Sequence, residues 1–186
     1  MNAGLVILIV VVVVALALFA VLMSRRRRTE GLRERFGPEY ERTMARAGDR
    51  RAAESELVER EDRRRELTIV PLEPAMQARY QQEWRTTQAR FVDDPAGATR
   101  DADVLVSRVM RERGYPVDDD FERQAADVSV DHPQVAENYR AAHALFRANE
   151  QGLASTDDLR QAFVHYRSLF SELLDVDGDD REEAHR

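Results

Sequence analysis

Residues 4–23 form an uninterrupted apolar run without a charged side chain, GLVILIVVVVVALALFAVLM. A helix rises about 1.5 Å per residue, so twenty residues cover the roughly 30 Å hydrocarbon core of a bilayer. The many valines disfavour a helix in water, but in lipid an unsatisfied backbone amide costs far more than this preference. The run therefore predicts a single transmembrane helix.

A cleaved signal peptide is the alternative interpretation of the same run. Signal peptides carry basic residues ahead of an apolar segment of about 7–15 residues and end in a small-residue cleavage site. Here no basic residue precedes the run, the run is longer, and the small-residue triplet at 15–17 lies inside it. We expect the span to be retained.

Four consecutive arginines follow the run directly, namely Arg25, Arg26, Arg27 and Arg28. Residues 1–3, on the other side, carry only the α-amino charge. The positive-inside rule therefore predicts a single-pass cell-membrane protein with its N-terminus outside and its C-terminal domain in the cytoplasm. The four arginines are also the predicted membrane-interface residues, because each contributes about 1 kcal/mol near anionic lipid headgroups.

The segments that follow are rich in charge. Residues 24–37 form a basic juxtamembrane segment, in which Leu32 and Phe36 predict a short helix with one apolar edge near the headgroups. Residues 29–66 hold ten arginines and eleven acidic residues, and Arg51 and Glu54 interrupt the apolar stripe that a coiled coil needs. We expect residues 38–66 to form a solvated helical stalk about 40 Å long. Self-association through this stalk is the alternative.

A change of composition at residues 67–74, LTIVPLEP, marks the start of a second domain. Pro71 and Pro74 prevent a continuous helix, which favours an extended connector. Over residues 75–174 apolar side chains recur at helical spacing in five segments. The predicted fold is therefore all-α: a transmembrane helix, a long charged helical stalk and a compact C-terminal bundle of about five helices. Residues 175–186 are expected to form an acidic disordered tail.

Local signals predict where several of the five helices begin and end. Asp94, followed by proline, is an expected N-cap, and Gly114 is an expected C-terminal cap. Asp131 is expected to cap the fourth helix. Ser155 and Asp158 have the spacing of a capping box at the start of the fifth.

No motif in the sequence predicts catalysis, a metal or a cofactor. The chain has no cysteine, and all 28 basic residues are arginine, which excludes thiol and Schiff-base lysine chemistry. The histidines, His132, His143, His165 and His185, lack the spacing of a zinc motif. Residues 67–186 hold 14 arginines and 24 acidic residues, a charge of −10, so nucleic acid is not an expected partner.

Two stretches, RYQQEWRTTQARFVDDPAGATRDADVLVSRVMRERGYP at 79–116 and VDHPQVAENYRAAH at 130–143, carry a resemblance. The chain resembles an uncharacterised group of single-span, membrane-anchored helical proteins of high-GC Gram-positive bacteria. The resemblance covers the span, the stalk and the helical domain, and it implies no activity, ligand or catalytic residue.

The sequence thus predicts a membrane-anchored, non-enzymatic protein-interaction or scaffold module with a cytoplasmic helical domain. Its expected partners are anionic lipid headgroups, a protein of unknown identity and, through the stalk, a second copy of the chain. The alternative is a membrane-tethered sensor domain for a small molecule or a metal, with His143 and His165 as candidate ligands.

Overall fold

The computed structural model describes residues 3–118 and 120–174, and for most of residues 3–25 it describes the backbone only. Every regular element in these ranges is a helix, so the all-α prediction is confirmed. The helices are α1 (Ala3–Phe36), α2 (Pro38–Ala47), α3 (Arg50–Glu66), α4 (Pro74–Arg90), α5 (Pro95–Arg113), α6 (Phe121–Asp131), α7 (Pro133–Glu150) and α8 (Thr156–Leu173). They form two compact units, Met1–Leu57 and Val58–Arg186.

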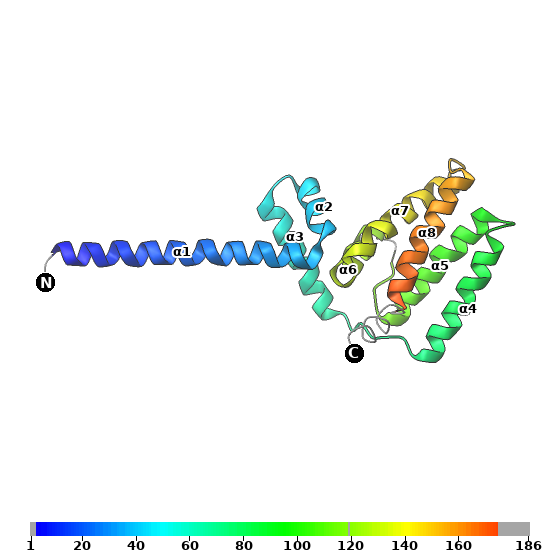
Figure 1. Ribbon diagram of the computed structural model, residues 1–186, viewed down its shortest axis with the longest axis horizontal. Coiled ribbons are helices and arrows are strands. Elements are labelled where there is room, and N and C mark those ends of the chain that lie inside the picture. Colours follow the sequence, from blue (N-terminus) through cyan, green and yellow to red (C-terminus); the bar gives the residue numbers. More distant parts are fainter. Residues whose placement is uncertain (1–2, 119, 175–186) are drawn as a thin grey trace, which may run out of the picture. The chain divides into compact units, whose positions relative to one another are not determined.

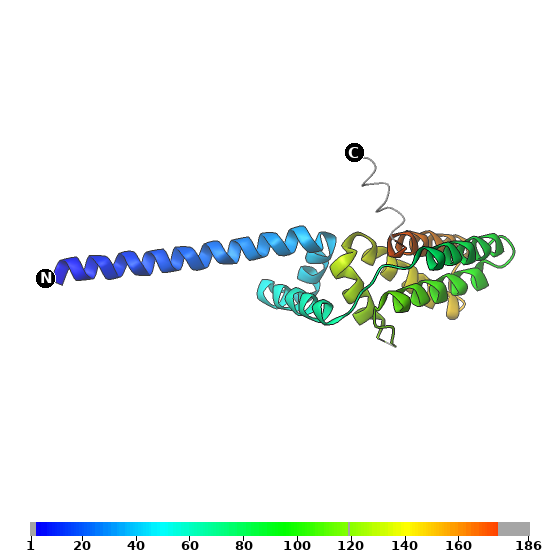
Figure 2. The ribbon, with the colours of Figure 1, turned by 90° about the horizontal axis from the view of Figure 1, so that it is seen from below.

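Helix α1 of the first unit is continuous from Ala3 to Phe36 (Figure 2). It ends at Gly37, where the sequence predicts a break, and Pro38 begins α2. Leu32 and Phe36 are buried, so the expectation that they form an apolar edge near the headgroups is wrong. Within the described residues, no helix combines the length and the apolar character needed to cross a bilayer. The span expected over residues 4–23 falls mostly on side chains outside that description.

The predicted 40 Å stalk is instead two helices, α2 and α3, that turn back on one another. The turn lies at Gly48, whose φ of 68° is left-handed and therefore favours glycine. Asp49 then accepts a hydrogen bond from the Ala52 amide at 2.9 Å and caps the start of α3. The Tyr40 hydroxyl donates to Glu54 at 3.2 Å, which holds the two helices together. Residues 38–66 are therefore helical as predicted, but a single 40 Å helical spacer is wrong.

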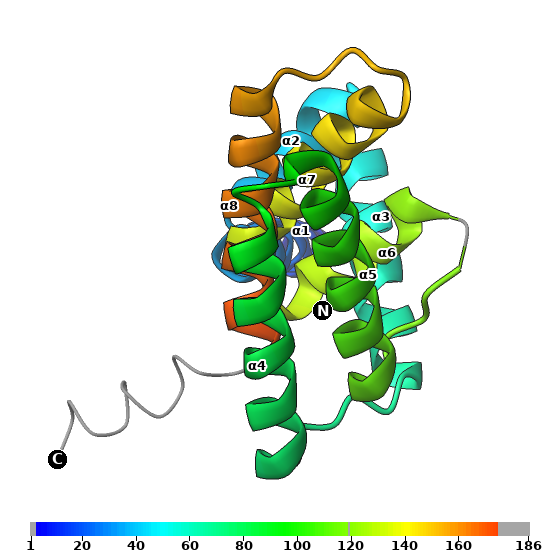
Figure 3. The same ribbon diagram turned by 90° about the vertical axis from the view of Figure 1, so that its right-hand side faces the viewer.

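The second unit is a bundle in which α4, α5, α7 and α8 run alongside one another and α6 lies against α7 (Figures 1 and 3). Trp84 of α4 packs against two rings of α8, with centroid distances of 4.9 Å to Phe163 and 4.7 Å to Phe170. The five helices predicted between residues 75 and 174 are confirmed as α4 to α8.

Three of the four predicted capping arrangements are confirmed. Asp94 accepts from the amide nitrogen of Gly97 at 2.8 Å, Gly114 ends α5 with φ of 95°, and a capping box begins α8. The expectation for Asp131 is wrong, because His132 occupies the N-cap of α7. The Asp131 carboxylate instead accepts a hydrogen bond from the Tyr115 hydroxyl at 2.7 Å, and it forms an ion pair with Arg64.

The second unit begins within α3, earlier than the predicted boundary at residues 67–74. The guanidinium of Arg60 is buried and donates to Ser129 of α6 at 3.2 Å. The connector that follows lies against the end of α5, where the Val70 amide donates to the Arg113 carbonyl at 2.9 Å. Residues 58–66 are thus part of the bundle rather than of a solvated stalk.

Candidate functional site

The structure places three of the four predicted membrane-interface arginines, and these three lie in two different surroundings. Arg26 and Arg28 line a large cavity of the first unit, whereas Arg27 lies beside Phe19 and Met23. The side chain of Arg25 lies outside the described residues. These residues follow each other on an unbroken helix, so successive side chains point about 100° apart and cannot form one face.

The cavity that contains Arg26 and Arg28 has a volume of about 920 Å³, and we call it the arginine cavity. Five arginines and three acidic residues line it, together with two hydroxyl side chains. The lining residues are Arg26, Arg28, Thr29, Glu30, Arg33, Asp49, Arg50, Arg51, Glu54 and Ser55. Its formal charge is therefore +2.

Two of the three carboxylates in the arginine cavity already serve the protein itself. Glu54 accepts hydrogen bonds from the hydroxyls of Thr29, at 2.8 Å, and Tyr40, at 3.2 Å, while Asp49 caps α3. In the part of the chain that the structure describes, Arg26, Arg28, Arg50 and Arg51 form no ion pair. Sequence reasoning missed Arg50 and Arg51, because only the chain reversal at Gly48 brings them near α1.

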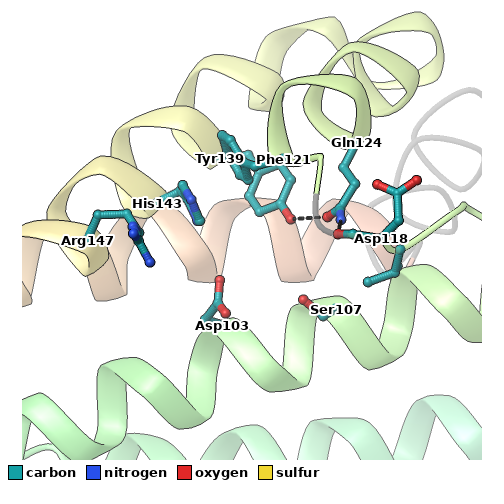
Figure 4. Close-up of a pocket in the computed structure, with 9 residues that line it drawn as sticks. Asp103, Ser107, Asp118, Phe121, Gln124, Tyr139, His143 and Arg147 are labelled. Atoms are coloured by element: carbon teal, nitrogen blue, oxygen red, sulfur yellow. Dashed lines mark hydrogen bonds between the residues drawn. The ribbon is translucent and has the colours of Figure 1, made fainter. Parts of the chain in front are cut away.

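A second cavity, of about 460 Å³, lies in the bundle between α5, α6 and α7, and we call it the bundle cavity (Figure 4). Polar side chains make up most of its lining. The lining residues are Asp103, Ser107, Val117, Asp118, Phe121, Gln124, Tyr139, His143 and Arg147. The Tyr139 hydroxyl donates to the Gln124 side-chain oxygen at 3.2 Å, and the Gln124 amide donates to the Asp118 carbonyl, so this wall is hydrogen-bonded.

Asp103 is the acidic group at the floor of the bundle cavity. It accepts a hydrogen bond from the Tyr166 hydroxyl at 2.8 Å. Burial raises the pKa of Asp103, and the Tyr166 hydrogen bond offsets part of this increase. A carboxylate held in such surroundings is stabilised by any cation that enters the cavity.

His143 forms a flat wall of the same cavity. Its ring stacks on Phe121 with a centroid distance of 3.6 Å and an interplanar angle of 7°. Burial lowers the pKa of His143, while the Asp103 charge raises it, and burial is the larger effect. The cavity thus combines the buried Asp103 carboxylate, a neutral aromatic surface and the Ser107 hydroxyl. Asp118 and Arg147 also line it, and the Asp118 carboxylate is paired with Arg123. This set fits a small polar molecule with a cationic group.

The candidate metal ligands are not gathered at one place. His165 contacts the Asn138 side-chain oxygen at 3.0 Å, and His132 contacts Glu172 at 3.1 Å, whereas His143 stacks on Phe121. His185 lies outside the described residues. Over residues 3–118 and 120–174 no three histidine or acidic side chains are placed to hold a metal ion.

No family model matches the chain, and no curated protein or solved structure is significantly similar to it. The resemblance to single-span bacterial proteins therefore stays a prediction.

Proposed function

We propose that the protein is a single-span, membrane-anchored, non-enzymatic interaction or scaffold module whose helical domain lies in the cytoplasm. The observation that carries this proposal is the uncharged run over residues 4–23 with four arginines directly after it. The helical backbone of α1 from Ala3 onward supports it, because only a fully hydrogen-bonded helix satisfies its amides in lipid.

A protein partner is supported by the surface of the bundle. Val92 is 83% exposed, in the connection from α4 to α5, and Leu153 is 74% exposed, in the connection from α7 to α8. Both connections lie at the same end of the bundle (Figure 1). These two exposed apolar side chains are therefore available for a partner to cover.

The topology is tested by cysteine labelling, which the cysteine-free sequence makes specific. Asn2→Cys and Asp179→Cys are introduced singly, and intact cells are treated with a membrane-impermeant maleimide. We expect labelling at position 2 and none at position 179 until the cells are permeabilised. Labelling of position 179 in intact cells would contradict a cytoplasmic domain.

The interaction role is tested by mild crosslinking in cells followed by purification of the full chain. We expect a reproducible crosslinked partner whose yield is reduced by Val92→Glu and unaffected by Gln82→Glu, the same change of charge at an exposed position of α4. Recovery of the bare monomer alone would count against a scaffold.

A small-molecule sensor is the second candidate function, and the bundle cavity is the observation that favours it. We expect small amines or other organic cations to raise the melting temperature of the purified full chain. Asp103→Asn should abolish this increase because it removes the buried carboxylate of the cavity, while the other lining carboxylate, Asp118, is already paired with Arg123. Equal responses of both proteins, or no response to any such compound, would rule out this function.

A further inference from the structure

The arginine cavity brings together five arginines and only three carboxylates, so it carries an excess of positive charge. Arg26 and Arg28 come from α1, and Arg50 and Arg51 come from the start of α3. Like charges that converge on one cavity repel one another, which costs free energy unless an anion binds between them. Guanidinium groups also match the geometry of phosphate oxygens, to which they donate two parallel hydrogen bonds.

The position of Arg50 and Arg51 is unfavourable for the helix that carries them. Both lie in the first turn of α3, which contains no acidic residue. The amino end of a helix carries a partial positive charge, so basic side chains are disfavoured there and anions are favoured. Stability of α3 therefore does not explain these two arginines, whereas an anion in the cavity would interact well with both side chains. The helix end itself is already capped by the Asp49 carboxylate.

The arginine cavity also lies at a defined distance from the apolar run. Arg26 and Arg28 follow its last residue, Met23, by three and five positions on the continuous helix α1. At 1.5 Å per residue this is about 5–8 Å along the axis. The headgroup layer on each side of a bilayer is about 5–8 Å thick, so a span over residues 4–23 places these arginines at the level of the lipid phosphates. The Thr29–Glu54 hydrogen bond holds α3 at the same level.

We infer that the arginine cavity binds the phosphate-bearing headgroup of an anionic phospholipid. The inference rests on the proposed function for the source of the phosphate, since only a membrane-spanning α1 brings the cavity to the headgroups. Its volume of about 920 Å³ lies within the range of pockets for small molecules. The site extends the predicted arginine cluster by two residues, Arg50 and Arg51, that are distant from the span in sequence.

The test compares two variants that remove the same charge from different places. Arg50→Gln/Arg51→Gln alters the arginine cavity and leaves the arginines that set the topology intact. Arg85→Gln/Arg111→Gln removes two exposed arginines of the bundle and is the control. Binding of phosphatidylglycerol to the purified full chain in neutral detergent is measured by native mass spectrometry, with phosphatidylcholine as the uncharged lipid and glycerol phosphate as the soluble phosphate.

We expect wild type and the control to bind phosphatidylglycerol equally, and the cavity variant to bind it at least about tenfold more weakly, since each arginine contributes about 1 kcal/mol. Phosphatidylcholine should bind weakly to all three. Equal binding by the two variants would overturn the site, and glycerol phosphate binding as tightly as the lipid would overturn the lipid as its source. Lipid binding in a detergent micelle does not depend on which side of a membrane the helical domain lies. A negative result here is therefore distinguishable from a negative result of the topology test. Unchanged circular dichroism spectra and melting temperatures of both variants establish that folding is intact.

Discussion

The Nε of Arg63 lies 3.4 Å from Oδ1 of Asp127, a carboxylate whose side chain is only 3% exposed. This ion pair joins the last turns of α3 to α6 within the second unit. Burial raises the pKa of Asp127, and the neighbouring Arg63 offsets part of that increase. Arg63 therefore partly compensates the cost of burying the Asp127 carboxylate. We expect its removal to lower the free energy of unfolding without changing the fold.

Replacing Arg63 by glutamine should lower the free energy of unfolding by about 1–2 kcal/mol, because it leaves the buried Asp127 carboxylate without its cation. The part-exposed arginine keeps the effect below that of a fully buried pair. Denaturant unfolding of the full chain in detergent, followed by circular dichroism, measures this change. The matched control is Arg65→Gln, which breaks the pairs of an exposed arginine with Asp62 and Glu61 and should cost less than about 1 kcal/mol. Equal losses for the two variants would contradict the compensating role of Arg63.

Replacing Gly114 by alanine should destabilise the protein by more than about 2 kcal/mol. Its φ of 95° is strained for any residue with a Cβ, and a Cβ at this position would lie 2.2 Å from the Thr68 carbonyl oxygen. Gly31→Ala is the control, since Gly31 lies inside α1 with nothing within 4 Å of its added Cβ. That change should be neutral or stabilise the helix by up to about 1 kcal/mol. Thermal unfolding of both variants decides the point, and a tolerated alanine at 114 would refute the close approach of the connector.

Replacing Trp84 by alanine should cost about 3–5 kcal/mol, the usual loss for removing a large buried ring. Trp84→Phe should cost much less, because it keeps a ring against Phe163 and Phe170 and because the indole N–H has no hydrogen-bond partner among the described residues. Melting temperatures measured by circular dichroism separate the two. Similar losses for both variants would contradict the expectation that a phenylalanine ring can replace the packing of Trp84 against Phe163 and Phe170.

The buried Asp103 should make stability depend on pH in a direction opposite to that of most carboxylates. Because burial raises its pKa in the folded state, the folded chain binds the proton more readily than the unfolded chain. Stability relative to Asp103→Asn should therefore increase as the pH falls from 7 towards about 4, the unfolded value. His143 also responds to this change, because the Asp103 charge raises the pKa of His143 and Asp103→Asn removes that charge. The folded variant therefore holds the His143 proton less readily and loses more stability as the pH falls. Both effects increase the stability of the wild type relative to the variant on acidification. Melting temperatures at constant ionic strength test this, and a difference that does not change with pH would contradict it.

The helix ends that the sequence predicts are those that depend only on neighbouring residues. Asp94, Gly114 and Ser155 act on amides or backbone angles within three residues of themselves, and all three are confirmed. Asp131 has the same local pattern, but Tyr115 and Arg64 lie far from it in the sequence and bind its carboxylate. No local pattern reveals such a competitor.

The two cavities depend on the same kind of distant contact. The arginine cavity exists because a single glycine, Gly48, reverses the chain, and a glycine is also tolerated within many helices. The polar residues of the bundle cavity come from three helices and from the connection before α6. Their spacing in the sequence does not indicate that Asp103 and His143 line the same cavity. The sequence identified the arginines directly after the apolar run. It did not indicate that Arg50 and Arg51 of α3 line the same cavity as Arg26 and Arg28.

The single tryptophan of the chain gives the protein an optical probe of one unit only. Trp84 lies in the aromatic core of the second unit, and the first unit contains no tryptophan at all. The intrinsic emission of the unmodified protein therefore follows the unfolding of the bundle, while its far-ultraviolet signal sums the helices of both units. A loss of helix signal at constant tryptophan emission would identify melting of the first unit alone, without any label or substitution.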